Sequence, residues 1–560
     1  MPPVLKEFFA VSVPASRKPG SFHGAEASTL AVYTAFCAVL CFFHAAWADE
    51  AQAWLIARDL PLLQIFTYRL HYEGTPGLWH FLLWILCRLH LPFAAMHGLS
   101  LLAGAAAVAV LLCYAPFPRP LRLLLPFAFA LVIPTAVVAR SYSLVPLLAF
   151  WLCASLRKAN FPPLAMALLI GLLANTSLIA FFLAVGLLLY SLFDSARLAQ
   201  PDALPRRIAA GLVLVLLLFA VYTAIPAPDL SGNNATSLTG NRKTSALLSR
   251  LTGIPAPAAT PKKVAGHDPV TAMPASLHAY QRWLWQAEHA KNSHGHGVPW
   301  LSSTLNFLSL AFFPVSSSNL LALLFYAALL AWLVQKRAWA AALPLVITLI
   351  GAKIIPFSEH HTSVLWTALI ATLWLAWDRP PARPSLANRV LLPVLLGLVL
   401  VEQAAWTAFA AACELHSPYD GGRDAAHWID SQPASPWIAG FNYHIVSIEP
   451  YVKTNPFRNR PTAYWSWSST ADTDAHLAET VAQHPGLIVV GEGYDGNVSW
   501  RNQIVPEKPA WGRNDPAPTD GYLLQLGYEP VQRFCGRHPD HFGFSEQTCE
   551  VIYQPHSDLH

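Results

Sequence analysis

The chain has 560 residues, of which 54% are hydrophobic and only 12% are charged, and its formal net charge is +4. Soluble domains carry about 25% charged residues, so this composition predicts a polytopic membrane protein held in a lipid bilayer. The basic residues lie in short loops between apolar runs and form no single patch, which argues against nucleic acid as a partner.

A polar N-terminal segment at 1–27 precedes the first apolar segment, at 29–47. The polar segment lacks the consecutive charged, apolar and cleavage regions of a secretory signal peptide. We therefore expect residues 1–27 to be cytoplasmic and the apolar segment to be an uncleaved membrane anchor.

Further apolar segments, bounded by charges, Pro or Gly, follow along the chain. They lie at 76–89, 93–114, 121–138, 144–156, 164–174, 178–193, 208–225, 320–334, 338–355, 363–377 and 390–413. Runs of this kind are typical of membrane-spanning helices. The predicted fold is a polytopic all-α membrane domain at 28–413 with about 11–13 transmembrane helices.

Short loops rich in Lys and Arg fall on one side of this domain, which the positive-inside tendency assigns to the cytoplasm. The other side, expected to be the periplasmic face of a bacterial inner membrane, receives the loops at 48–75 and 226–300 and the chain after residue 413. The second of these loops is rich in Pro, Ala, Ser, Asn and Gly, which predicts a substrate-gating loop or a linker. Its histidines indicate a solvated tract more readily than a metal site.

One loop conflicts with this assignment. Two simple spans between Glu73 and Tyr114 would place Arg119 and Arg122 outside, against the charge rule. Either a segment between 76 and 138 is re-entrant or this loop breaks the rule.

From residue 414 the composition becomes polar, and 414–560 has the length of one compact domain. The pattern predicts a small α/β extracytoplasmic domain, with helices at 424–431 and 475–483 and strands at 437–441, 486–490, 522–526 and 551–553. Cys535 and Cys549 lie well inside it, and a disulfide between them would fit an oxidising compartment.

Two adjacent carboxylates, Asp49 and Glu50, follow the first apolar segment. Acids at the edge of a membrane are costly unless they face water, a partner or a substrate. The residues from 48 to 59 have helical spacing, which predicts an amphipathic helix along the membrane surface that also carries Arg58. The alternative is a helix cap or a simple water-facing end of the span.

Two further polar groups are expected on the same side. His71, Tyr72 and Glu73 precede a Gly-Thr-Pro-Gly turn that opens the next apolar segment. Arg140 and Tyr142 lie between two short apolar runs, where an arginine suits bidentate binding of a phosphate or pyrophosphate. The alternative for Arg140 is an anchor that extends to the membrane surface.

A fourth polar group opens another apolar segment from that side. It contains Lys353 and the run Glu359, His360 and His361. These side chains would contact phosphate or sugar hydroxyl groups, or they have a structural role.

The motifs at 49–54, 73–79 and 139–144 together resemble those of the GT-C integral-membrane glycosyltransferases, most nearly the mannosyltransferase and aminoarabinose-transferase type. The resemblance implies inverting transfer of a sugar from a polyprenyl-phosphate carrier to a glycan, lipid or protein acceptor. It also implies that Asp49 is the base or positions the acceptor, with Glu50 beside it. Gly77 stands where the family's turn usually has a second Pro. Some relatives use Mg²⁺ or Mn²⁺, and the dependence of this chain on a metal stays open.

Two other functions compete with this one. A transporter or flippase of a lipid-linked sugar would need polar groups along a path across the membrane, whereas here they gather on one face, which favours an enzyme. A non-catalytic assembly protein would bind partners through its external domain, with Trp465, Trp467 and Trp500 as stacking surfaces or, more simply, as core residues.

Overall fold

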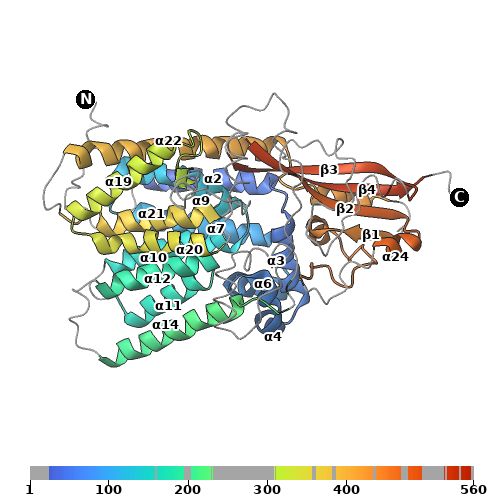
Figure 1. Cartoon of the computed structure of the whole chain (residues 1–560), viewed down its shortest axis with the longest axis horizontal. Coiled ribbons are helices and arrows are strands. Elements are labelled where there is room, and N and C mark those ends of the chain that lie inside the picture. Colours follow the sequence, from blue (N-terminus) through green and yellow to red (C-terminus); the bar gives the residue numbers. More distant parts are fainter. Residues whose placement is uncertain are drawn as a thin grey trace, which may run out of the picture.

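The computed structural model describes residues 24–157, 161–193, 203–228, 230, 308–309, 311–355, 361–380, 386–432, 437–467, 477–494, 523, 526–541 and 544–556. The predicted loop at 226–300 lies almost entirely outside these residues, as do Trp500 and most of 1–27. Figure 1 shows a bundle of helices at one end of the molecule and a small sheet at the other, with α22 (Leu386–His416) running along the bundle toward the sheet.

Within the described residues, four helices are long and apolar enough to cross a membrane. They are α2 (Gly24–Phe43), α7 (Ala95–Tyr114), α14 (Ala203–Ala224) and α22. A fifth candidate is a pair of segments that meet at 64°, formed by α8 (Arg119–Leu124) with η2 (Leu125–Phe127) and α9 (Phe129–Val132) with η3 (Ile133–Val137). The helical nature of the region is therefore confirmed, and the length and composition of these helices suit a membrane protein.

The other apolar helices have 10–17 residues, so the number of spans stays a prediction. They are α6 (Leu78–Arg88), η4 (Ser141–Ser143) with α10 (Leu144–Leu156), α11 (Pro163–Ala174), α12 (Leu178–Phe193), α19 (Asn319–Gln335), η5 (Trp339–Ala342) with α20 (Leu343–Ile354), and α21 (Thr362–Ala376).

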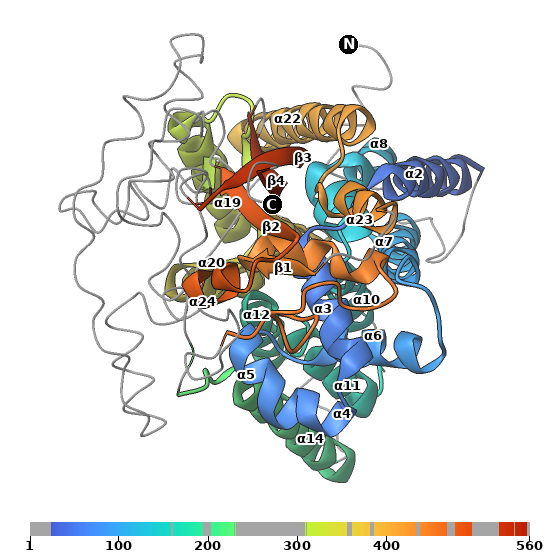
Figure 2. The same ribbon diagram turned by 90° about the vertical axis from the view of Figure 1, so that its right-hand side faces the viewer.

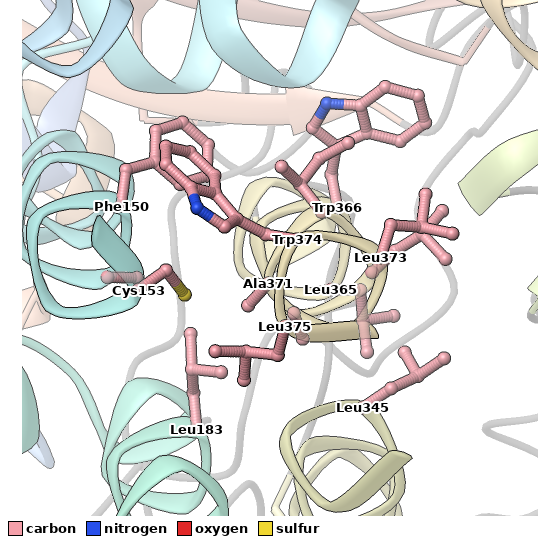
Figure 3. Close-up of a cluster of buried hydrophobic side chains, with 14 of the residues drawn as sticks. Phe150, Cys153, Leu183, Leu345, Leu365, Trp366, Ala371, Leu373, Trp374 and Leu375 are labelled. Carbon is pink, nitrogen blue, oxygen red and sulfur yellow. The ribbon is translucent and has the colours of Figure 1, made fainter. Parts of the chain in front are cut away.

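The centre of the bundle is α21, whose residues are all buried. It carries apolar side chains together with Ser and Thr but no charge, as expected for a helix surrounded by protein on every side. Figure 3 shows Trp374 from α21 next to Phe150 and Cys153 of α10, with Leu183 and Leu345 on neighbouring helices. The ring centroids of Trp374 and Phe150 are 5.7 Å apart, with 30° between the planes. This core fixes the helices that surround it.

Charged groups distinguish the two ends of the bundle. Near the start of α2, the buried Glu26 pairs with Arg119 over 3.4 Å and with Arg122 over 3.5 Å. The helix has 20 residues and is about 30 Å long. Asp49 follows its other end, so Arg119 and Arg122 lie at the end of the bundle remote from Asp49.

The segment at 76–89 accounts for this difference from the expected topology. It forms α6, whose 11 residues extend about 16 Å, roughly half the thickness of a bilayer core. The helix packs along α3 (Ala48–Asp59), and Arg88 donates hydrogen bonds to the carbonyl oxygens of Arg58 (3.1 Å) and Leu60 (3.4 Å). The packing of α6 along α3 agrees with the re-entrant alternative for 76–138, and so does the position of the arginines that follow α7.

After the bundle, the described residues form four strands in the spatial order β1-β2-β4-β3. β1 (Ile438–Phe441) runs parallel to β2 (Leu487–Tyr494), and β4 (Phe544–Pro555) is antiparallel to β2 and to β3 (Tyr528–His541). Alternate residues of the sheet pack against α23 (Gly422–Asp430) on one face and α24 (Leu477–Ala482) on the other. In Figure 2 these elements lie across one end of the helical bundle.

Most of the elements predicted in this region are found. The predicted helices correspond to α23 and α24, and three of the predicted strands to β1, β2 and part of β4. The strand predicted at 522–526 falls mostly outside the described residues. β3 was not predicted from the sequence. Pro530, where the pairing of β3 with β4 is irregular, and the charged residues of β3 interrupt the pattern expected of a strand.

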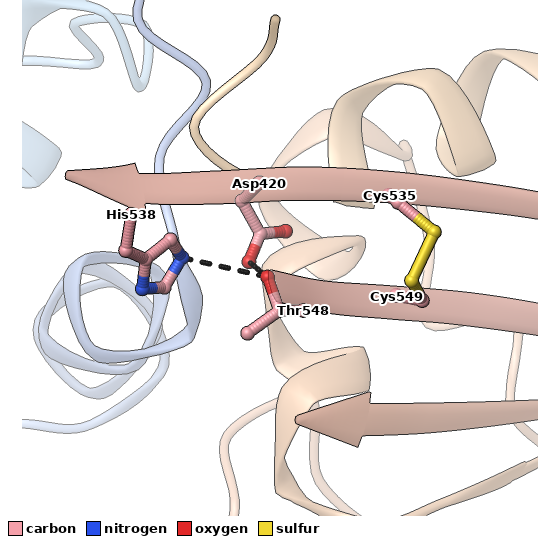
Figure 4. Close-up of a disulfide and its surroundings, with 5 residues drawn as sticks. All are labelled: Asp420, Cys535, His538, Thr548 and Cys549. Atoms are coloured by element: carbon pink, nitrogen blue, oxygen red, sulfur yellow. Dashed lines mark hydrogen bonds between the residues drawn. A yellow bond between two sulfur atoms is a disulfide. The ribbon is translucent and has the colours of Figure 1, made fainter. Parts of the chain in front are cut away.

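Cys535 and Cys549 face each other across β3 and β4 and form a disulfide, as predicted (Figure 4). The cross-link joins residues 14 apart in the sequence. It therefore ties the last two strands of the sheet together.

Replacing both cysteines with serine should lower the free energy of unfolding of this region by about 3 kcal/mol, the value expected for a loop of this size. Thermal unfolding of the purified chain, with and without dithiothreitol, measures the effect. Cys87→Ser, at a half-buried free cysteine, serves as the control. A wild-type melting temperature that does not respond to the reductant would contradict the disulfide.

Two carboxyl groups, Asp420 and Glu550, are buried side by side behind the sheet. Asp420 accepts hydrogen bonds from the amide of Gly422 (2.8 Å) and the hydroxyl of Thr548 (3.3 Å), while Glu550 accepts one from Ser447 (3.3 Å). Burial raises the pKa of both carboxyl groups, and the charge of Asp420 raises that of Glu550 further. The folded protein therefore favours the protonated form of both carboxyl groups.

This pair predicts a dependence of stability on pH. The pKa values are higher in the folded than in the unfolded chain, so the stabilisation is complete below about pH 4 and is lost as the pH rises through the raised folded values. Glu550→Gln, which cannot ionise, should raise the melting temperature at about pH 8 and have less effect near about pH 5. The exposed Glu529→Gln is the control, and a pH-independent effect of Glu550→Gln would contradict the interpretation.

Candidate functional site

α3 holds Asp49 and Glu50 in its first turn, where carboxylates are favoured by the helix dipole. The helix was expected to lie on the membrane surface with one exposed face. Instead nearly all of it is buried, because α6 packs on one side and residues 443–467 of the terminal region cover the other. Asp49 therefore lies where the helical bundle meets the terminal region.

Glu50 points into the protein and is fully buried. Its Oε2 lies 2.9 Å from Nε2 of His44, and its Oε1 accepts the amide hydrogen of Ala139 over 2.5 Å. Nδ1 of His44 lies 3.1 Å from Oε1 of the buried Glu414. We refer to His44, Glu50 and Glu414 as the His44 bridge, which joins the end of α2, the start of α3 and the end of α22.

The opposite charges of the His44 bridge stabilise one another. Burial alone would lower the pKa of His44, but Glu414 and Glu50 raise it to about 10. Burial would raise the pKa of Glu50, but His44 brings it below its ordinary value. His44 is therefore an imidazolium between two carboxylates, and Glu50 supports the site instead of facing a substrate.

Asp49 points the other way and is 30% exposed. It forms an ion pair with Arg140, and its Oδ1 accepts a hydrogen bond of 2.6 Å from the hydroxyl of Tyr443. The amide of Ala139, held by Glu50, immediately precedes Arg140 in the chain. The adjacent acids thus have different roles. Glu50 holds the backbone at Ala139, and Asp49 pairs with the next residue, Arg140.

The third and fourth predicted groups also meet here. The guanidinium of Arg140 lies 5.7 Å from the ring centroid of Tyr142, and the Tyr142 hydroxyl lies 3.0 Å from Nε2 of His361. His361 stands directly before α21. Asp49, Arg140, Tyr142 and His361 therefore form one continuous chain of contacts.

Glu73 lies on the adjacent side of α3. Its Oε1 accepts hydrogen bonds from Gln52 (3.0 Å) and from Arg69 (2.7 Å). Burial raises the pKa of Glu73, and Arg69 only partly offsets this. Gln52 also pairs with both backbone groups of Trp465, at 3.0 and 2.8 Å, which attaches the terminal region to α3.

The turn after Glu73 is shaped by glycines. The turn is preceded by three short helical segments, α4 (Leu62–Gln64), η1 (Ile65–Arg69) and α5 (Leu70–Glu73). Gly74 ends α5 in the left-handed conformation, with φ of 60°. A side chain at Gly77 would overlap Phe66. This explains the glycine at that position.

Other predicted residues lie away from Asp49. His71 contacts the carbonyl oxygen of Ile225 over 2.7 Å, and Tyr72 contacts Tyr68. Arg58 pairs with Asp59 at the far end of α3. Lys353 is in the last turn of α20, and Glu359 and His360 fall outside the described residues.

Sequence reasoning did not single out Gln52, Arg69 or Tyr443. Gln52 had a usable signal, since it stands three residues after Asp49 and must share its face of a helix. Arg69 likewise stands four residues before Glu73. Tyr443 had none, because it approaches from 394 positions away.

A metal ion has one candidate location among the described residues. Ligand atoms of His44, Glu50 and His97, all buried, lie within 4.8 Å of one another. Nitrogen ligands of this kind suit Zn²⁺ or Mn²⁺ better than Mg²⁺. Both oxygens of Glu50 already have protein partners, however, so the arrangement is satisfied without an ion. The arrangement leaves the question of Mg²⁺ or Mn²⁺ dependence open.

No protein-family model matches the sequence, and no curated protein matches it either. The likeness of the motifs at 49–54, 73–79 and 139–144 to GT-C enzymes therefore depends on those residues alone.

Replacing His44 with leucine should leave two buried carboxylates without their cation. Breaking a buried ion pair in this way costs about 3–5 kcal/mol, so the melting temperature of the purified protein should fall markedly. His416→Leu is a matched control, because His416 is exposed on the same helix as Glu414. Equal melting temperatures for the two variants would contradict a structural role for the bridge.

Proposed function

We propose that the protein is an inverting glycosyltransferase of the GT-C type, which transfers a sugar from a polyprenyl-phosphate carrier to an acceptor hydroxyl. The observation that carries the proposal is the partly exposed carboxylate of Asp49, held between Arg140 and Tyr443. A base and a cation side by side are what the displacement of a phosphate by a hydroxyl requires.

In the proposed reaction, the acceptor oxygen attacks the anomeric carbon while Asp49 takes the hydroxyl proton. The bond between that carbon and the phosphate oxygen breaks, and its electron pair leaves with the lipid phosphate. Arg140 balances the charge that develops on the phosphate. Attack opposite to the leaving group inverts the configuration of the sugar.

The location of the site supports this chemistry. Asp49 follows the end of an apolar helix, so a lipid tail would lie among the helices while its head group reaches the carboxylate. The proposed orientation places this end and residues 414–560 on the periplasmic side of a bacterial inner membrane, with 11–13 spans in all. A disulfide in the terminal region fits such an oxidising compartment.

The packing of the bundle favours an enzyme over a flippase or transporter. α21, at its centre, is buried throughout and carries no charged residue. Apart from Ser and Thr the side chains of α21 are apolar, so this central helix contributes no charged group to a route across the bundle. The polar residues of the site instead gather where the bundle meets the terminal region.

Asp49→Asn tests the proposal. General-base catalysis contributes roughly 10²–10⁴-fold, so transfer should fall by about that factor. The assay uses the purified chain with radiolabelled polyprenyl-phosphate sugars and a panel of glycan, lipid and protein acceptors.

Asp59→Asn, at the far end of the same helix, is the control and should retain full activity. Full transfer by Asp49→Asn would show that Asp49 is not the base. Absence of transfer by the wild type with every carrier would favour the non-catalytic assembly function.

A further inference from the structure

Tyr443 brings a hydroxyl group from the terminal region to the carboxylate of Asp49. The hydroxyl donates a hydrogen bond of 2.6 Å to Oδ1, while the other carboxylate oxygen, Oδ2, pairs with Arg140. Each oxygen of Asp49 thus has a protein partner, and only 30% of the side chain is exposed. An acceptor hydroxyl that approaches Oδ1 therefore shares it with Tyr443, displaces Tyr443 or binds to Tyr443 itself.

A tyrosine hydroxyl can pass a proton on, because it donates a hydrogen bond while its oxygen accepts others. The donated bond of Tyr443 goes to Asp49, and its oxygen has no donor among the described residues. The side chain is half-buried, which leaves part of it open to a substrate. Burial and the charge of Asp49 raise the pKa of Tyr443 above its ordinary value, so the hydroxyl keeps its proton until an acceptor arrives.

The aromatic rings around Tyr443 hold its side chain in place. Its ring centroid lies 4.8 Å from that of Trp467 and 6.2 Å from that of Trp465. Trp465 is buried, and Gln52 of α3 is bonded to both of its backbone groups. The position of the hydroxyl therefore depends on the packing of the ring as well as on the bond to Asp49.

The backbone directly before Tyr443 is strained. Asn442 follows β1 with φ of 73° and ψ of 157°, a combination that is essentially confined to glycine. Its side chain is buried, and its Oδ1 accepts the amide hydrogen of Tyr443 over 2.5 Å. Strained residues persist only where their surroundings fix them, and they gather at functional sites. The strain at Asn442 thus agrees with a functional requirement on the direction of Tyr443.

A hydroxyl that only stabilised the charge of Asp49 would hinder a base. A hydrogen bond to the charged form of a carboxyl group favours that form and makes the group a weaker base. Arg140 already stabilises the charge of Asp49. The Tyr443 hydroxyl, aimed at the base, is therefore better explained by transfer of its proton than by further support of the charge.

We propose that Tyr443 is a catalytic residue, which relays the proton of the acceptor hydroxyl to Asp49. The proposal rests on the proposed function, since it concerns the same reaction. The acceptor gives its proton to the phenolic oxygen of Tyr443 while the proton of Tyr443 passes to Oδ1 of Asp49. The acceptor's electron pair forms the bond to the anomeric carbon, and the pair of the breaking bond leaves with the lipid phosphate. Tyr443 is neutral before and after the step, and Asp49 ends protonated.

Tyr443→Phe tests the relay in the full-length chain, with the radiolabelled polyprenyl-phosphate sugar and the acceptor that give the most transfer in the wild type. The variant keeps the ring contacts, so its melting temperature and its KM for the lipid-linked sugar should stay near those of the wild type. Its kcat should fall by about 10²-fold, the lower end of what general-base catalysis contributes, because water can still carry the proton.

Tyr528→Phe is the matched control. It removes a buried hydroxyl that donates a hydrogen bond of 2.9 Å to the carbonyl oxygen of Pro485, and it should keep the wild-type kcat. A kcat of Tyr443→Phe equal to or above that of the wild type would overturn the relay, because the hydroxyl would then only stabilise the charge of Asp49.

A proton inventory separates the relay from a structural role of the hydroxyl. The rate of single-turnover transfer by the wild type is measured in mixtures of H₂O and D₂O. Two protons that move together in the relay should give a curved dependence on the fraction of D₂O, whereas direct transfer of one proton gives a straight line. A straight line would overturn the relay even if Tyr443→Phe were slow.

The outcomes distinguish this inference from the proposed function. If Asp49→Asn loses transfer and Tyr443→Phe keeps it, the relay is overturned and the glycosyltransferase function stands. Absence of transfer by the wild type with every carrier would overturn both. Loss of transfer in both variants, with a curved proton inventory in the wild type, would support both.

Discussion

The buried imidazolium of His44 between Glu50 and Glu414 is the interaction on which the site depends. A charged group inside a protein is tolerated only when its partners are fixed and close. Here the partners come from three places: the first turn of α3, the end of α22 and, through Glu50, the backbone before Arg140. One cation therefore determines where two helices and a loop meet.

The different roles of adjacent acids follow from this arrangement. Successive residues of a helix point in directions about 100° apart, so when Glu50 turns inward to His44, Asp49 must turn toward the terminal region. There Tyr443 and Arg140 meet it. The side chain that is available to a substrate is thus selected by the burial of its neighbour.

Much of the site could be predicted from the sequence because its residues lie at the ends of apolar segments on the same predicted side of the membrane. Asp49, Arg140 and His361 each stand at the start or end of an apolar segment, and such ends must gather at a membrane surface. Local spacing also predicted the helix that carries Asp49, and the position of Cys535 and Cys549 well inside the terminal region suggested their disulfide. The run at 76–89 has the composition of a lipid-facing segment, and no local pattern shows that it packs along α3.

The remaining contacts are tertiary and left no local pattern. Gln52 reaches the backbone of Trp465, where any residue type except Pro would offer the same groups. In the sequence His44 is one residue near the end of the apolar segment at 29–47, and its partner Glu414 is an ordinary acid after another apolar segment. Neither the pairing nor the burial can be deduced without knowing that α2 and α22 end side by side.

The hydrogen bond from Tyr443 to Asp49 joins residues 394 positions apart, and that from His44 to Glu414 spans 370. At synthesis rates of about 5–20 residues per second, the later partners emerge roughly 20–80 seconds after the earlier ones. During that interval Asp49 has Arg140 but lacks Tyr443, His44 has Glu50 but lacks Glu414, and the face of α3 that residues 443–467 cover has no protein against it. The helix that carries Asp49 therefore takes its final place only when the last part of the chain arrives, so that assembly of the site is among the final steps of biogenesis.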